Sequence, residues 1–152
     1  MTMETIQVQM KRQPGTEDVP LPEYMSEHAS GMDVRAAVTE PVTLAPGQVG
    51  LIPTGFHIAI PPGYEVQVRP RSGLALKRGL TVLNAPGTID SDYRGEVQVI
   101  LVNLSAEAQR VEPGDRVAQL VFAPVTRALM VAVIALADSD RGAGGFGSTG
   151  VR

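Results

Sequence analysis

Asn84-Ala-Pro-Gly-Thr-Ile-Asp-Ser-Asp-Tyr-Arg-Gly-Glu-Val97 contains two turn signals, and the pattern predicts a β-hairpin. Proline presets the backbone for a turn and glycine accepts a positive φ, so Pro86-Gly87 predicts one bend and Arg94-Gly95 a second. An alternating strand follows from Glu96 to Val102. Between the bends lie two carboxylates and a ring that a rigid turn could aim at a small molecule, although a surface hairpin with solvated acids has the same pattern. These three residues are Asp90, Asp92 and Tyr93.

The Pro-Gly pair occurs five times, and each occurrence predicts a tight reversal of the chain. The pairs are Pro14-Gly15, Pro46-Gly47, Pro62-Gly63, Pro86-Gly87 and Pro113-Gly114. Strand-like runs lie between them, some with strict alternation of apolar and polar residues. The predicted strands are Ile6 to Met10, Met32 to Val38, Gln48 to Ile60, Tyr64 to Arg69, Glu96 to Leu104, Asp115 to Pro124 and Leu129 to Ala137.

Only Ser72 to Gly79 has a helical pattern, with Ser72 as a possible N-cap and Gly79 as its end. Many short strands separated by turns, with one short helix, predict an all-β sandwich or barrel of the jelly-roll kind. The chain of 152 residues is expected to form one domain over residues 1–137. The run Leu129 to Leu136 has almost no polar face, which indicates either a strand buried on both sides or a subunit contact.

Composition excludes several classes of protein. The absence of cysteine excludes disulfides and thiolate chemistry. A net charge of -3 gives no long-range attraction for nucleic acid, so we expect no nucleic-acid partner. The sequence contains no run of 18 apolar residues and no signal-peptide pattern, so we expect no membrane partner and a cytoplasmic location.

Residues 138–152 are rich in glycine and predict a flexible C-terminal arm. Gly142-x-Gly144-x-x-Gly147 matches a dinucleotide-binding pattern, but neither a helix nor a βαβ unit surrounds it, so we reject that function. Arg141, Phe146, Ser148 and Thr149 could instead contact a phosphate and a base, whereas a plain disordered tail is the alternative.

Two other segments could carry chemistry. Arg69-Pro-Arg71-Ser72-Gly73 places two guanidinium groups at a helix start, which predicts either an anion site or an ordinary N-cap with surface arginines. Asp33 lies early in a strand, where aspartate is disfavoured, so it is either held for a site or paired with Arg35 or another arginine. His28 and His57 do not form part of a recognisable triad, and no cluster has metal-ligand spacing.

Five segments follow one another along residues 29–150. They are Ala29-Ser-Gly-Met-Asp-Val-Arg-Ala36, Arg69-Pro-Arg-Ser-Gly-Leu-Ala75, Asn84-Ala-Pro-Gly-Thr-Ile-Asp-Ser-Asp-Tyr-Arg-Gly95, Gly114-Asp-Arg-Val-Ala-Gln119 and Arg141-Gly-Ala-Gly-Gly-Phe-Gly-Ser-Thr-Gly150. Together they resemble the five ordered motifs of the trimeric dUTPase family.

The resemblance implies a jelly-roll homotrimer with three active sites between subunits. It implies Mg²⁺-dependent hydrolysis of dUTP to dUMP and pyrophosphate by water attack at the α-phosphorus, which limits uracil in DNA and supplies dUMP for thymidylate synthesis. We expect triphosphate oxygens and water to hold the Mg²⁺, with no direct protein ligand. The alternatives are a dCTP deaminase of the same fold and a non-catalytic jelly-roll nucleotide-binding module.

The resemblance also implies roles for single residues. Asp90 resembles the residue that orients or deprotonates the attacking water, and Asp33 resembles an acid near the sugar and the metal-bound water that activity requires. Tyr93 resembles the ring that packs under the deoxyribose. Ser91-Asp92 departs from the family pattern, and we expect Asp92 to point away from Asp90.

The remaining expected site residues contact the base or the phosphates. The residues that resemble the uracil-binding group are Asn84, Gly87, Thr88 and Ile89. The residues that resemble phosphate contacts are Arg71, Ser72, Gly73 and Gln119. In the arm, Phe146 resembles the ring that stacks on uracil, and the further contacts are Arg141, Gly147, Ser148 and Thr149.

Overall fold

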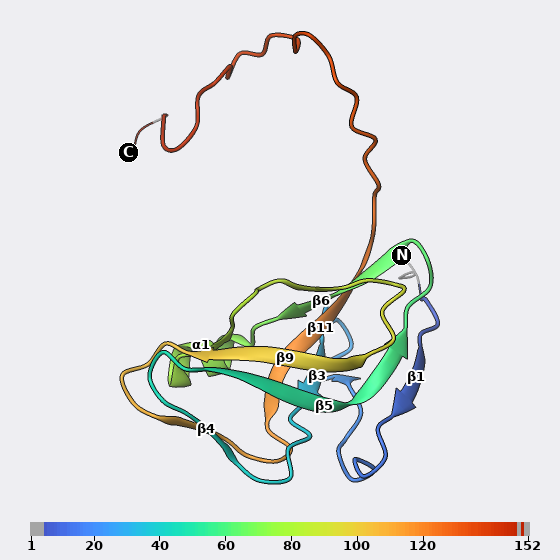
Figure 1. Cartoon of the computed structure of the whole chain (residues 1–152), viewed down its shortest axis with the longest axis vertical. Coiled ribbons are helices and arrows are strands. Elements are labelled where there is room, and N and C mark those ends of the chain that lie inside the picture. The colour runs from blue at the N-terminus through green and yellow to red at the C-terminus, as the bar shows by residue number, and fades with distance from the viewer. Residues whose placement is uncertain (1–4, 149, 151–152) are drawn as a thin grey trace.

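The computed structural model of the chain describes residues 5–148 and residue 150. Within this part, eleven strands and one short helix follow one another (Figure 1). They are β1 (Gln9–Arg12), β2 (Glu23–Tyr24), β3 (Met32–Arg35), β4 (Val42–Leu44), β5 (Val49–Ala59), β6 (Tyr64–Arg69), α1 (Ser72–Arg78), β7 (Leu80–Val82), β8 (Gly87–Ile89), β9 (Glu96–Asn103), β10 (Gln109–Val111) and β11 (Arg116–Pro124). The helix is too short and too polar to cross a membrane, and no other helix occurs in the described residues.

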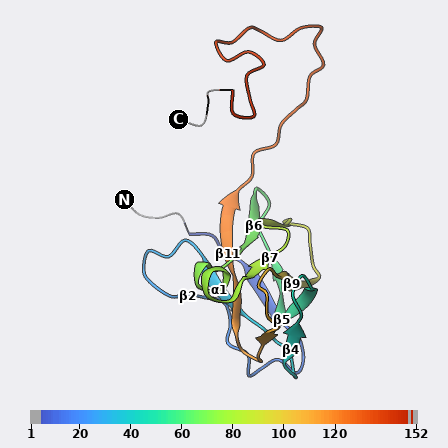
Figure 2. The same cartoon turned by 90° about the vertical axis from the view of Figure 1, so that its left-hand side faces the viewer.

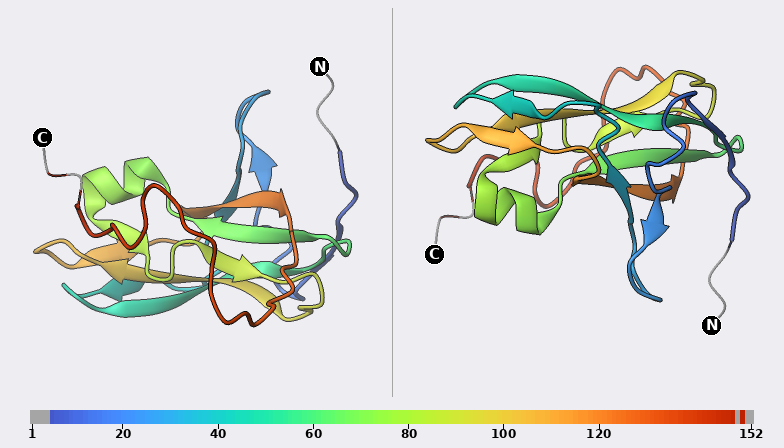
Figure 3. Two further views of the ribbon diagram at one scale, coloured as in Figure 1. Left: turned by 90° about the horizontal axis from the view of Figure 1, so that it is seen from above. Right: turned by 90° about the horizontal axis from the view of Figure 1, so that it is seen from below.

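The strands form two facing layers. One layer is a four-stranded sheet with the order β1-β5-β9-β7, and the other is a five-stranded sheet with the order β2-β3-β11-β6-β8. A separate pair, β10-β4, extends one end of the sandwich. All strand pairs are antiparallel. Seen from the side and from both ends, the layers stack with α1 at one end (Figures 2 and 3). The predicted all-β, jelly-roll-like fold is therefore confirmed.

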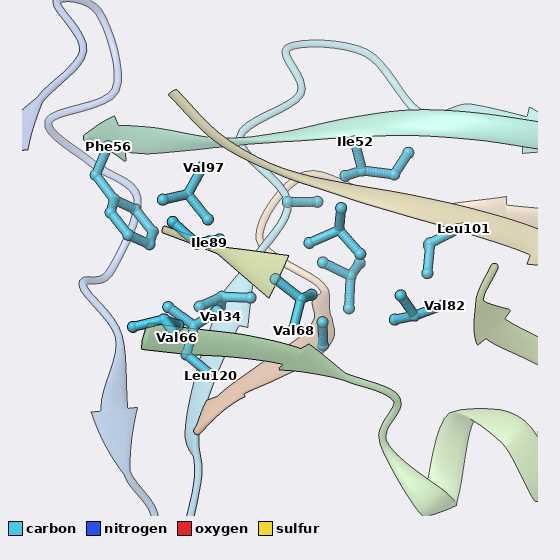
Figure 4. Close-up of a cluster of buried hydrophobic side chains, with 14 of the residues drawn as sticks. Val34, Ile52, Phe56, Val66, Val68, Val82, Ile89, Val97, Leu101 and Leu120 are labelled. Carbon is cyan, nitrogen blue, oxygen red and sulfur yellow. The ribbon is translucent and has the colours of Figure 1, made fainter. Parts of the chain in front are cut away.

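Alternating apolar residues fill the space between the layers. In β6, Val66 and Val68 are buried while Glu65 and Gln67 face outward, as the sequence pattern predicts. Opposite them, β5 and β9 direct Ile52, Val97 and Leu101 inward (Figure 4). Each strand directs every second side chain toward the other sheet. The apolar side chains of the two inner faces therefore pack against each other, and this contact holds the sheets together.

The predicted hairpin at Asn84 to Val97 is wrong. Strand β8 pairs with β6 in the five-stranded sheet, whereas β9 pairs with β5 and β7 in the four-stranded sheet. The segment therefore crosses from one layer to the other. Gly87 is a strand residue without a positive φ, in contrast to the glycines of the other four Pro-Gly pairs, Gly15, Gly47, Gly63 and Gly114. The chain crosses between the layers because Ile89 on β8 and Val97 on β9 are both buried, and each enters the core from a different sheet.

The helix is where the sequence predicts it, but its cap differs. Gly79 ends α1 in a left-handed conformation, as expected. Ser72, however, is the first helical residue and not the N-cap; Arg71 occupies the N-cap position without a side-chain hydrogen bond to the helix. The strand at Tyr64–Arg69 has its predicted bounds, whereas the first strand begins at Gln9 and not at Ile6.

The predicted strand at Leu129 to Ala137 is also wrong. The chain leaves the body after β11, and residues 125–137 form no strand (Figure 1). The large apolar side chains from Leu129 to Leu136 are 59% to 108% exposed, with Val133 and Ile134 as the two extremes. A strand needs both a neighbour for its backbone and a surface for its apolar side chains, and the described part of one chain offers neither to this segment.

Candidate active site

The first group of predicted site residues surrounds Asp33 on the five-stranded sheet. Asp33 on β3 lies opposite Gln119 on β11, and Gln119 lies opposite Arg69 on β6. The Asp33 side chain is only 12% exposed and has two cationic partners. Its Oδ1 accepts a hydrogen bond from Arg71 Nε at 3.2 Å, and its Oδ2 accepts one from Arg116 Nη1 at 3.1 Å. Asp33 is therefore paired with two arginines other than Arg35.

This cluster presents more positive than negative charge. Two guanidinium groups share one carboxylate, so a net positive charge is left at the start of α1, where a polyanion could bind. Ser72 and Gly73 follow Arg71 directly and are exposed. A Cβ added at Gly73 would meet nothing within 4 Å, so space for a ligand is open there.

Gln119 is fixed at the edge of the same cluster. Its Nε2 donates to the Pro70 carbonyl oxygen at 2.9 Å. Gly31 packs against it so closely that a Cβ at residue 31 would lie 2.5 Å from Gln119 Oε1. A side chain at residue 31 would therefore force Gln119 to move from its place beside the residues that precede α1.

The second group lines a cavity of ≈ 200 Å³ where the chain crosses from β8 to β9. Asp90 and Tyr93 contribute to its wall, and Tyr93 N–H donates to the Asp90 carbonyl oxygen at 3.1 Å to form the turn between them. Tyr93 Oη donates to the Glu96 carbonyl oxygen at 2.9 Å. The ring lies on Gly95, because a Cβ at that residue would be 2.2 Å from Tyr93 Oη. The turn thus holds a carboxylate and a ring at one opening, whereas Asp92 does not line the cavity, although all three side chains are exposed.

The residues predicted to bind the base lie along β8. Thr88 and Ile89 line the same cavity as Asp90. Gly87 begins the strand, and a Cβ there would lie 3.1 Å from Asn84 Nδ2 and 3.2 Å from Val68 Cβ. Asn84 therefore reaches toward the backbone of Gly87, which brings the predicted base-binding residues into one short segment.

The third group lies in the arm and stands away from the body (Figures 1 and 2). Arg141 Nε donates to the Gly144 carbonyl oxygen at 2.8 Å, within the arm itself. Phe146 is 115% exposed. Gly147 and Ser148 are also exposed, and Thr149 lies outside the described residues. Within one chain, then, the described part of the arm does not meet the other two groups.

The first and second groups are also separate. Asp33, Arg71 and Arg116 do not line the cavity beside Asp90. The wall of that cavity consists of Leu51, Thr88, Ile89, Asp90, Tyr93, Glu96, Val97, Gln98 and Ile100. The predicted site residues of a single chain thus form three groups, each assembled locally but not joined to the others.

Several residues of these groups were missed at the level of the sequence. Arg116 is the second partner of Asp33, and its position at a strand start, in the same segment as Gln119, was the available signal. Glu96 follows the Arg94-Gly95 turn signal directly. Leu51 and Ile100 gave no signal, because an outward apolar residue in an alternating strand looks like many others. Within residues 5–148 and 150, no three histidine, aspartate or glutamate side chains gather as a metal site.

Comparison with known proteins gives a consistent result. A family model described as dUTPase matches residues 17–150. A deoxyuridine 5'-triphosphate nucleotidohydrolase of Desulfotalea psychrophila is 60% identical over 136 residues, covering 90% of this chain and 91% of that protein. One of Methylocella silvestris is 56% identical over 149 residues, covering 97% and 93%. The structure of the Staphylococcus bacteriophage 80alpha dUTPase with dUPNHPP is 28% identical, with a TM-score of 0.84 over 97% of this chain and 100% of that one. With 60% identity over nine tenths of its length and a matching family model, this chain belongs to the dUTPase family.

Proposed function

We propose that the chain hydrolyses dUTP to dUMP and pyrophosphate, with Asp90 acting on the attacking water. The observation that carries this proposal is the shared cavity of Asp90 and Tyr93, which puts a carboxylate beside a ring that could cover a sugar. The family relationship supports the substrate.

In the proposed reaction the Asp90 carboxylate orients a water molecule and accepts its proton. The water oxygen forms a bond to the α-phosphorus while the bond from that phosphorus to the α,β-bridging oxygen breaks, and pyrophosphate leaves. Phosphoryl displacement depends on alignment and charge neutralisation more than on covalent catalysis. Asp90 directly follows β8 and precedes the Tyr93 turn, so a strand and a turn fix its backbone on both sides.

The Asp33 cluster is proposed to bind the triphosphate. Arg71 supplies charge, while Ser72, Gly73 and Gln119 supply hydrogen-bond donors at an open surface. Asp33 holds Arg71 in position and has a further proposed role near the sugar and the metal-bound water. Because the described residues form no acidic cluster, bound Mg²⁺ would be held mainly by triphosphate oxygens and water, where it neutralises charge on the phosphates.

Selectivity for deoxyuridine is proposed to come from β8 and its flanks. Asn84 and the backbone of Gly87, Thr88 and Ile89 can distinguish uracil from cytosine by their hydrogen-bond pattern, because a mismatch leaves a polar group unpaired. Tyr93 packs under the deoxyribose and excludes a 2′-hydroxyl group. The arm, residues 138–152, closes over the nucleotide with Phe146 on the base and with Arg141, Gly147, Ser148 and Thr149 on the phosphates.

The separation of the three groups supports a homotrimer whose sites form between subunits. A cavity of ≈ 580 Å³ opens between β1 and β2, which are edge strands of the two facing sheets. Its wall is mainly apolar and includes Met10, Tyr24, Met32, Phe56, Leu120 and Phe122. We propose that Leu129 to Leu136 of a second copy fills this cavity as a strand, which would cover the exposed apolar side chains of that segment.

Light scattering should then give the mass of a trimer, and a monomer mass would contradict the assembly.

Phosphorus NMR of the protein with dUTP and Mg²⁺ tests the proposed function. The expected products are dUMP and pyrophosphate, with much slower turnover of dTTP, dCTP and UTP. Ammonia release from dCTP would indicate the deaminase alternative, and the absence of turnover with any nucleotide would indicate a binding module. Either of these results would overturn the proposal.

A further inference from the structure

A histidine outside the predicted site joins the N-terminal turn to the Tyr93 turn. His57 lies on β5, next to a shift in the register between β5 and β9, and pairs with Glu96 on β9 and with Lys11 on β1. Its ring Nδ1 lies 3.0 Å from the Arg94 carbonyl oxygen. Its Nε2 lies 2.9 Å from the side-chain amide of Gln13. Both ring nitrogens of a partly exposed histidine are therefore engaged.

The chemistry of the partners determines which atom donates in the hydrogen bond between His57 Nδ1 and Arg94. A carbonyl oxygen can only accept, so Nδ1 of His57 must carry the proton and donate to Arg94. The Gln13 amide has both an oxygen and an NH₂ group, so by its orientation it can match Nε2 whether that nitrogen is protonated or not. Gln13 can therefore hydrogen-bond to Nε2 of His57 while Nδ1 donates to the Arg94 carbonyl oxygen.

The Gln13 end of this connection is anchored. Gln13 N–H donates to the Gly55 carbonyl oxygen at 2.8 Å. Thr16 Oγ1 lies 2.7 Å from the Gln13 carbonyl oxygen and 2.9 Å from that of Gly55. The backbone N–H groups of Glu17 and Gly15 donate to the Glu17 carboxylate and lower its pKa. The charged carboxylate thus accepts hydrogen bonds from the backbone of this turn. The N-terminal turn is therefore bound to β5, and it does not lie free on the surface.

The Arg94 end of the connection reaches the cavity. Arg94 follows Tyr93 in the chain, and its side chain also donates to the Tyr93 carbonyl oxygen at 2.8 Å. On the far side of the turn, Glu96 accepts the Tyr93 hydroxyl through its carbonyl oxygen and Gly55 N–H through its Oε1 at 2.9 Å. Strand β5 thus holds the turn at two points, Arg94 by way of His57 and Glu96 by way of Gly55.

We propose that His57 is a positioning residue that sets the selectivity for deoxyribose by fixing the Tyr93 turn through the Arg94 carbonyl. This inference rests on the proposed function, in which Tyr93 excludes the 2′-hydroxyl group. Without the His57 hydrogen bond, the bonds within the turn remain, such as Arg94 Nη1 to the Ser91 carbonyl oxygen at 2.7 Å, but of the two points of attachment to β5 only Glu96 is left. The turn can then shift as a unit relative to β5, and its ring can move to admit a ribose. His57 itself does not line the cavity, so it acts on substrate binding only through the position of the Tyr93 turn.

Two amide substitutions separate the two ring contacts. In His57→Asn the amide nitrogen is bonded to Cγ, as Nδ1 is, so it can still donate to Arg94. In His57→Gln the amide nitrogen lies one bond further out, as Nε2 does, and it can retain only the Gln13 contact. His57→Leu removes both contacts, and His28→Leu, at an exposed loop histidine, is the control.

The measured quantity is the ratio of kcat/KM for dUTP to kcat/KM for UTP. We expect His57→Asn and His28→Leu to keep the wild-type ratio, whereas His57→Gln and His57→Leu lower it about three- to tenfold, which is the usual effect of one hydrogen bond. The change should lie in KM rather than in kcat, chiefly as a lower KM for UTP. Equal ratios for His57→Asn and His57→Gln, whether retained or lost together, would overturn the inference. If the wild-type protein hydrolyses no dUTP, the proposed function itself fails, so the two failures are distinguishable.

Discussion

The turn between β8 and β9 and the arm that follows β11 differ in how they hold their functional residues. In the turn, Tyr93 is fixed by its hydroxyl bond to Glu96 and by close packing on Gly95. In the described part of the arm, the Arg141 side chain donates to the nearby Gly144 carbonyl oxygen and Phe146 is fully exposed. One region presents its residues already in place, and the other can act only after moving onto a ligand or a neighbouring subunit.

The difference suggests a division of work. Residues on the strands can be pre-organised because the sandwich core fixes their backbone, and pre-organisation is what charge stabilisation and water orientation require. Residues on the arm can exclude water and complete the phosphate contacts without blocking the entry of the nucleotide. Loss of a turn residue should therefore remove the chemical step, while loss of the arm should leave a folded protein with a slow reaction.

The largest effect is expected at Asp90. Asp90→Asn should lower kcat for dUTP by about 10²–10⁴-fold, because the proposed acceptor of the water proton is lost. Binding of a non-hydrolysable dUTP analogue, measured by calorimetry, should be retained. Asp92→Asn, at the exposed aspartate two residues further on, is the matched control and should keep wild-type turnover. Near-normal turnover of Asp90→Asn would remove Asp90 from its proposed role.

A smaller effect is expected from the arm. Deletion of residues 141–152 should lower kcat/KM on the order of 10²-fold, since the substrate is then less well aligned. The melting temperature and the trimer mass should not change, because the described residues of the arm lie away from the core (Figure 1). Full activity of the truncated chain would mean that residues 141–152 are a plain tail.

The smallest of the three effects is expected at Asp33. Asp33→Asn leaves Arg71 and Arg116 without their shared counter-charge, and the loss of such a charged hydrogen bond corresponds to about a tenfold fall in kcat/KM. The melting temperature should also fall, because the Asp33 side chain is largely buried. Glu23→Gln is the control, since it breaks an exposed 3.8 Å pair with Arg35 that contributes little. An unchanged kcat/KM for Asp33→Asn would show that Arg71 needs no carboxylate to hold it.

Local patterns predicted much of this fold. Strict alternation located β6 to the residue, and a glycine stop located the end of α1, because both signals depend on neighbours within a few residues. The pairing of β8 with β6 could not be predicted from Asn84 to Val97 alone. Turn residues show where the chain bends, whereas the partner of a strand depends on side chains far away in the sequence, here Val66 and Val68.

The site was predictable to a similar extent. Asp33 was identified as unusual because a carboxylate is disfavoured in a strand, but its partners, Arg71 and Arg116, are 38 and 83 residues away in the chain. His57 was set aside because it does not lie near a serine-carboxylate arrangement that would indicate a triad, and its contacts with Gln13 and Arg94 exist only in the folded sandwich. Residue type therefore indicated candidates, and tertiary register determined their partners.

A mixed-trimer experiment tests most directly whether the turn and the arm of one site come from different chains. Asp90→Asn and the chain lacking residues 141–152 are unfolded together in equal amounts, refolded and assayed for pyrophosphate release. If each site takes Asp90 from one subunit and the arm from another, about a quarter of the sites in random trimers receive both intact parts, and activity should rise to about a quarter of wild type. If both parts of a site came from the same chain, every site would carry a defect, and the mixture would be no more active than the two variants assayed separately. That second result would contradict the account.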